Sequence, residues 1–127
     1  MAKILIADDD AGVRQFLQAV LEEAGHELGF ANDGEQAIEF FRRGSFDLAI
    51  VDLIMPKRNG VIAIHEIIDH DPGAKIIAIS ADITGQLDLA REAGALALLP
   101  KPMTADDLLG AIALLLRRST GWQGVRE

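Results

Sequence analysis

Short apolar runs recur along this chain of 127 residues, and their alternation with helical patterns restricts its fold more than any other feature. Four runs, at 3–7, 48–51, 75–79 and 96–99, have the length of strands buried on both faces, as in parallel sheets. A weaker fifth run covers 26–31. Between the runs, apolar residues follow helical spacing, for example at Val13, Phe16, Leu17, Val20 and Leu21.

The same spacing predicts five helices, over 11–24, 35–43, 60–70, a segment ending at Gly94, and 105–118. Asp10 is placed as an N-cap, and Thr104 with Asp107 resembles a capping box. Strands that alternate with helices imply parallel pairing, right-handed crossovers and helices on both faces of the sheet. We expect one α/β domain over 1–118 and a C-terminal tail over 119–127.

Composition removes several classes of function. The net charge of −8 weighs against direct DNA binding, which normally needs a basic face. No apolar run approaches the roughly 20 residues of a membrane span. The absence of cysteine excludes disulfides and thiolate metal sites. We therefore expect a cytoplasmic protein that contacts neither membrane nor DNA.

Groups capable of chemistry follow four of the predicted strands. Asp8 and Asp9 follow the first, Asp52 the third, Ser80 the fourth and Lys101 the fifth. Taken singly, each has an ordinary interpretation as a helix cap, a turn residue or a solvated surface charge. Because the carboxyl ends of parallel strands share one edge of the sheet, the five are expected to converge there.

Their chemistry indicates a metal-assisted phosphoryl transfer. Three carboxylates at close quarters repel one another, and a hard divalent cation such as Mg²⁺ or Mn²⁺ relieves that repulsion. A carboxylate beside the metal can attack phosphorus and form an aspartyl phosphate. Lys101 would neutralise charge on the transferred group, and Ser80 would donate a hydroxyl hydrogen bond.

The motifs resemble those of response-regulator receiver domains, the phosphoacceptor modules of two-component signalling. The matching stretches are ILIADDDAGVR at 4–14, VDLIMPKRNG at 51–60, ISA at 79–81 and PKP at 100–102, within a likeness over about 2–118. The resemblance implies a single flavodoxin-like, doubly wound sheet of five parallel strands in the order 2-1-3-4-5, with five helices. It also implies a cis peptide bond before Pro102.

Carried over residue by residue, the resemblance makes Asp52 the phosphorylated residue. Asp8, Asp9, Asp52 and the backbone carbonyl of Ile54 would hold Mg²⁺. Ser80 and Lys101 would contact the phosphoryl oxygens. The phosphoryl group would come from a histidine kinase or a phosphotransfer protein, and the result would be read by a downstream output protein or by self-dimerisation.

The chain departs from the family pattern in three ways. Leu98 stands where the family usually has an aromatic switch residue, and Pro100 stiffens the loop before Lys101. Ile54 and Asp82 occupy the two positions that tune hydrolysis of the phosphoaspartate in the family. We hypothesise that Ile54 blocks an attacking water while Asp82 adds like charge, so that the phosphorylated state is long-lived.

The last predicted helix suggests a binding surface. Leu108, Leu109, Ile112, Leu115 and Leu116 form a core-facing stripe, but Leu114 lies outside it. Either the whole helix is well buried, or an apolar patch on the fourth helix, fifth strand and fifth helix binds a partner or a second copy.

Two rival functions stay open at this point. A Mg²⁺-dependent phosphatase resembling the haloacid dehalogenase group would use Asp8 as its nucleophile, but it gives Asp52 and the MPKRNG run no role. A flavodoxin would need a Ser/Thr-rich phosphate-binding loop, which the chain lacks. We favour the signalling switch, which is not an enzyme beyond single-turnover phosphorylation and dephosphorylation of itself.

Overall fold

The fold is a parallel sheet of five strands in the order β2-β1-β3-β4-β5, as expected. The computed structural model describes residues 2–55, 57, 59–81 and 86–117. Every neighbouring pair of strands runs parallel. The strands are β1 (Lys3–Ala7), β2 (Glu27–Ala31), β3 (Leu48–Asp52), β4 (Ile76–Ser80) and β5 (Ala97–Pro100).

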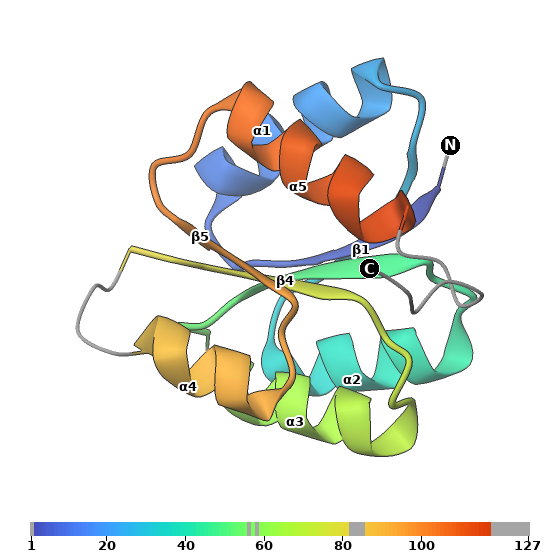
Figure 1. Cartoon of the computed structure of the whole chain (residues 1–127), viewed down its shortest axis with the longest axis vertical. Coiled ribbons are helices and arrows are strands. Elements are labelled where there is room, and N and C mark those ends of the chain that lie inside the picture. The colour runs from blue at the N-terminus through green and yellow to red at the C-terminus, as the bar shows by residue number, and fades with distance from the viewer. Residues whose placement is uncertain (1, 56, 58, 82–85, 118–127) are drawn as a thin grey trace.

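Five helices cover the two faces of this sheet, as Figure 1 shows. On one face lie α1 (Ala11–Glu23) and α5 (Ala105–Arg117). On the other lie α2 (Gly34–Arg43), α3 (Gly60–His70) and α4 (Gln86–Ala93). Among the described residues, no helix has the length and apolar character that crossing a membrane requires.

The chain stops and starts its helices with the residues that the sequence suggested. The Asp10 carboxylate accepts hydrogen bonds from the N–H groups of Gly12 and Val13, as an N-cap does. Thr104 and Asp107 exchange side-chain and backbone hydrogen bonds of 3.0 and 3.2 Å, which confirms the capping box. Gly94 ends α4 with a φ of 122°, a conformation that favours glycine.

Two apolar cores enclose the sheet and fix its central strands. All five residues of β3 and all five of β4 are buried, as continuous apolar runs in a doubly covered sheet should be. The predicted bounds of four strands are off by one residue, because a strand begins and ends with its ladder hydrogen bonds and not with its apolar residues. Thus β2 starts at Glu27, β3 includes Asp52, β4 covers Ile76–Ser80, and β5 includes Pro100 but not Leu96.

The stripe predicted on the last helix is also confirmed. Leu108, Ile112 and Leu115 are buried against the sheet, and Leu109 and Leu116 pack partly against them. Leu114 points away, with half of its surface exposed, so the helix is not buried on every side. The predicted tail at 119–127 lies outside the described residues.

Candidate functional site

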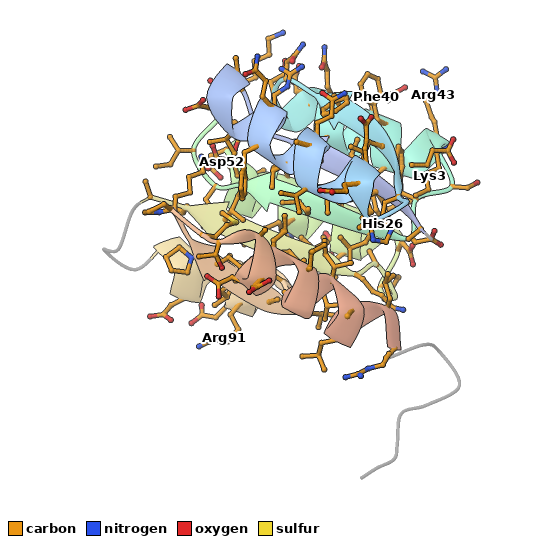
Figure 2. The ribbon with its side chains drawn as sticks, turned by 90° about the horizontal axis from the view of Figure 1, so that it is seen from above. Lys3, His26, Phe40, Arg43, Asp52 and Arg91 are labelled. Atoms are coloured by element: carbon orange, nitrogen blue, oxygen red, sulfur yellow. The ribbon has the colours of Figure 1, made fainter. Side chains whose placement is uncertain are left out.

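Three aspartates from two strand ends meet at the carboxyl edge of the sheet. Asp52 is the last residue of β3, and Asp8 and Asp9 follow β1, the strand paired beside it. One carboxylate oxygen of each lies within 4.8 Å of the others. Figure 2 shows Asp52 at the end of the sheet opposite Lys3 and His26. The predicted convergence is therefore real for all three carboxylates.

Lys101, directly after β5, adds a positive charge to this cluster. Its Nζ lies 3.1 Å from Asp8 Oδ2 and 3.2 Å from Asp52 Oδ2, so one ammonium group bridges both carboxylates. The backbone N–H of Lys101 donates a 2.8 Å hydrogen bond to the carbonyl of Ser80, which ties the loop after β5 to the end of β4. The peptide bond between Lys101 and Pro102 is cis, as the resemblance implied.

Ser80 is placed at the same edge. It is the final residue of β4 and is fully buried. Its strand pairs with β3 so that Ile79 lies opposite Asp52. The sequence therefore placed all five candidate side chains at one edge, on the ends of four adjacent strands.

Burial and the negative charge of Asp8 both raise the pKa of Asp52. Only 4% of the residue is exposed, and this desolvation together with the neighbouring Asp8 charge raises the pKa of Asp52 to about 6. The N–H of Ile54, 3.2 Å from Asp52 Oδ1, and the Lys101 ammonium oppose the rise. The pKa of Lys101 is itself raised: burial acts to lower it, but the two carboxylates outweigh that effect.

These shifts predict how Asp52→Asn changes stability in metal-free protein. A carboxyl whose pKa is higher in the folded state stabilises that state below its ordinary pKa, and this contribution is lost as pH rises through about 6. Because the variant has no such charge, its free energy of unfolding is expected to exceed that of wild type by about 1 to 2 kcal/mol at pH 8 and by little at pH 4. Urea unfolding at both pH values measures this, and an equal gain at both would contradict it.

The donor set fits a hard divalent cation. Asp8 Oδ1 accepts a 2.9 Å hydrogen bond from the N–H of Asp10, which fixes the carboxylate. Asp8 Oδ2 is buried, and the Lys101 ammonium lies 3.1 Å from it. An exposed Asp9 beside two buried carboxylates leaves one side open to solvent, as a cation that retains waters needs. Oxygen-only donors of this kind suit Mg²⁺ or Mn²⁺.

The residues predicted to tune the switch and the lifetime of the phosphoaspartate, Ile54, Leu98 and Asp82, do not all lie at the carboxylate cluster. Ile54 stands directly beyond Asp52, with 56% of its surface exposed. Leu98 in β5 is partly buried and packs against the core under α2, α3 and α4. Asp82 lies outside the described residues, so its predicted place near the phosphoacceptor stays a prediction.

Two contributors to the site were not foreseen. Asp10 was expected only as a helix cap, yet its N–H also orients Asp8. Gly60, the first residue of α3, passes so close to β3 that a side chain there would meet the backbone of Asp52 and Leu53. Position in the sequence gave no sign of either contact, because both depend on how loops return to the sheet.

Known proteins share both sequence and fold with this chain. The family model described as the response regulator receiver domain matches residues 4–113. The transcriptional regulatory protein PdtaR of Mycobacterium tuberculosis is 37% identical over 117 residues, which are 91% of this chain and 57% of that protein. The chemotaxis protein CheY of Thermotoga maritima is 37% identical over 114 residues, 87% of this chain and 93% of CheY.

Solved structures agree. A CheY-like receiver domain protein from Methanospirillum hungatei superimposes with a TM-score of 0.88 at 27% identity, covering 93% of this chain and 95% of that one. The response regulator TrrA of Thermotoga maritima, solved in complex with Mg²⁺ and BeF, superimposes with a TM-score of 0.84 at 34% identity. The match covers 91% of this chain and 99% of that one. The chain spans about half the length of several curated relatives it matches. It belongs to the receiver domain family of two-component response regulators.

Proposed function

We propose that this receiver domain is a phosphoacceptor switch in which Asp52 takes a phosphoryl group. The observation that carries the proposal is the pairing of a buried Asp52 with the Lys101 ammonium 3.2 Å away, beside two further carboxylates. TrrA, a relative, was solved with Mg²⁺ and BeF, which supports the same chemistry here.

The side chains divide the work of the transfer. An Asp52 carboxylate oxygen attacks phosphorus while Lys101 and the Ser80 hydroxyl contact the phosphoryl oxygens. Asp8, Asp9, Asp52 and the backbone carbonyl of Ile54 would hold Mg²⁺, which supplies charge neutralisation. Each receiver turns over its own phosphoryl group once, so the domain is a switch and not an enzyme that processes many substrate molecules.

Intact mass spectrometry tests this assignment. The protein is incubated with acetyl phosphate, with Mg²⁺ or with a chelator, and the site is mapped by borohydride reduction, which converts a phosphoaspartate to homoserine. We expect one phosphoryl group at Asp52, lost in Asp52→Asn and without metal. Homoserine at Asp8 would instead assign the phosphatase-like chemistry. Asp33→Asn, at a buried aspartate that caps α2, is the matched control and should still be phosphorylated.

The partners follow from the family. The donor would be a histidine kinase or a phosphotransfer protein, and the reader an output protein or a second copy. Several relatives of about twice this length are named transcriptional regulatory proteins, but the net charge of −8 disfavours DNA binding by this domain itself. A cytoplasmic location suits such partners.

The output surface would be the face formed by α4, β5 and α5. Leu89, Leu96 and Leu114 lie on these elements or beside them, and each has 46 to 50% of its surface exposed. Contiguous exposed apolar patches mark interaction surfaces, and these leucines would contribute to such a patch. Sedimentation of the phosphorylated and unphosphorylated forms tests for a dimer, and Leu96→Asp should weaken it. A monomer in both states, without a partner footprint on this face, would remove the surface from the proposal.

Ile54 supports a prediction about the lifetime of the phosphorylated state. Its exposed side chain stands beside Asp52 and would exclude a water that attacks phosphorus. Ile54→Asn replaces this apolar cover by a group that holds water, so the half-life of the phosphoprotein is expected to fall by about threefold or more. Decay of the phosphorylated mass after removal of donor measures it, with the similarly exposed Ile62→Asn as control. An equal or longer half-life would contradict the hypothesis.

A further inference from the structure

An apolar groove runs beside the carboxylate cluster, between the start of α1 and the loop that precedes α5. Its volume is about 410 Å³, and its lining comes from Gly12, Val13, Phe16, Ala81, Pro102, Met103 and Lys101. Phe16 follows the helical spacing of the apolar residues in α1, but 37% of this residue is exposed. An aromatic ring thus remains at the surface, where it borders the groove.

The groove and the phosphoacceptor share one side chain. Among the described residues that line the groove, Lys101 alone carries a charge. Its ammonium lies 3.2 Å from Asp52 Oδ2, so a molecule in the groove can place an anionic head next to the nucleophile. The rest of the lining offers apolar surface, which does not bind a small polar leaving group.

We infer that this groove selects small phosphodonors with an apolar body, namely acyl phosphates whose acyl chain is longer than that of acetyl phosphate. The inference rests on the proposed phosphorylation of Asp52. The Asp52 oxygen forms the new bond to phosphorus while the bond from phosphorus to the acyl oxygen breaks. The acyl group leaves as a carboxylate with the electron pair of the broken bond, so no proton or redox partner is needed.

The size and character of the groove set the expected selectivity. Its volume is in the range of small-molecule sites and exceeds that of a short acyl chain several times over. Butyryl and acetyl phosphate release carboxylates of nearly equal basicity, so their rates differ through contacts of the chain and not through leaving-group chemistry. Partial burial of two additional methylene groups predicts a preference for butyryl phosphate of about three- to tenfold.

The test compares the second-order rate constants for phosphorylation of Asp52 by the two donors at saturating Mg²⁺. Wild type, Phe16→Ala, Phe16→Leu and Phe40→Ala are measured by intact mass. Phe40, on α2, is the matched control because it is the same residue type with the same 37% exposure but does not line the groove. Circular dichroism shows whether each variant is folded.

We expect the butyryl-to-acetyl ratio to be well above one in wild type and in Phe40→Ala. It should fall close to one in Phe16→Ala and recover partly in Phe16→Leu, which restores apolar surface. A wild-type ratio near one, or a ratio that Phe16→Ala leaves unchanged, would overturn the inference while leaving Asp52 as phosphoacceptor, and would assign the groove to apolar side chains of a protein donor. If neither donor modifies Asp52, the proposed function fails and the inference fails with it.

Discussion

Replacing Gly60 by alanine is expected to lower the free energy of unfolding by about 3 kcal/mol, although the change adds one methyl group. A Cβ at this position would lie 2.5 Å from Leu53 Cα and even closer to the carbonyl oxygen of Asp52. Both obstacles are backbone atoms, so no rotamer change relieves the clash. The N–H of Gly60 also donates a 2.9 Å hydrogen bond to the carbonyl of Leu53, which holds the two segments together.

Gly110→Ala is the matched control for this substitution. Gly110 lies in the middle of α5, and a Cβ there would meet nothing within 4 Å. Alanine at an open helical position stabilises a helix relative to glycine, so the free energy of unfolding should rise by about 0.5 to 1 kcal/mol. Urea unfolding of both variants gives the comparison. A loss below about 1 kcal/mol in Gly60→Ala would show that the loop after β3 can move away from Asp52.

The same loop links stability to the chemistry of the site. Displacing the backbone of Asp52 would move its carboxylate relative to Asp8 and Lys101. We therefore expect Gly60→Ala to slow phosphorylation even at temperatures where the variant is fully folded.

Replacing Lys101 by methionine is expected to lower the free energy of unfolding by about 2 to 4 kcal/mol at pH 8. The ammonium group is the bridge between Asp8, which is fully buried, and Asp52, which is 4% exposed. Without it, the two carboxylates repel each other in a poorly solvated site, and the pKa of Asp52 should rise further above its value of about 6.

The pH dependence separates this effect from a simple packing defect. The folded state of the variant would hold the Asp52 proton more tightly than wild type does. The free energy of unfolding of the variant is therefore higher at low pH and falls as pH rises through the raised pKa of Asp52. Unfolding at pH 5 should therefore show a clearly smaller loss than at pH 8, and saturating Mg²⁺ should restore part of the loss at pH 8. An equal loss at both pH values would contradict the electrostatic explanation.

Lys57→Met supplies the matched control. Lys57 also pairs with a buried aspartate, Asp33, but at 3.7 Å and with 62% of its side chain exposed. An exposed pair of this kind contributes at most about 1 kcal/mol. The contrast between the two lysines tests whether burial decides the contribution of each ion pair.

The sequence by itself determined the architecture. Continuous apolar runs require strands that are covered on both faces, and the helices predicted between them supply that cover. Periodicity therefore predicted a parallel sheet with helices on both faces, and the family resemblance added the strand order. Residues at strand ends could be placed at one edge because parallel strands share a direction. This rule alone brings together five residues: Asp8, Asp9, Asp52, Ser80 and Lys101.

Contacts between segments distant in the sequence were decided only by the tertiary structure. The ion pair between Lys101 and Asp52 joins residues 49 positions apart, and the same ammonium group also reaches Asp8. The pKa of Asp52 depends on burial and on the nearby Asp8 charge, which are likewise set by packing. Helical spacing grouped Phe16 with the other apolar residues of α1, yet the space between α1 and the loop before α5 leaves Phe16 partly exposed. Periodicity specifies the face of a helix, whereas what lies opposite that face depends on how the other elements pack.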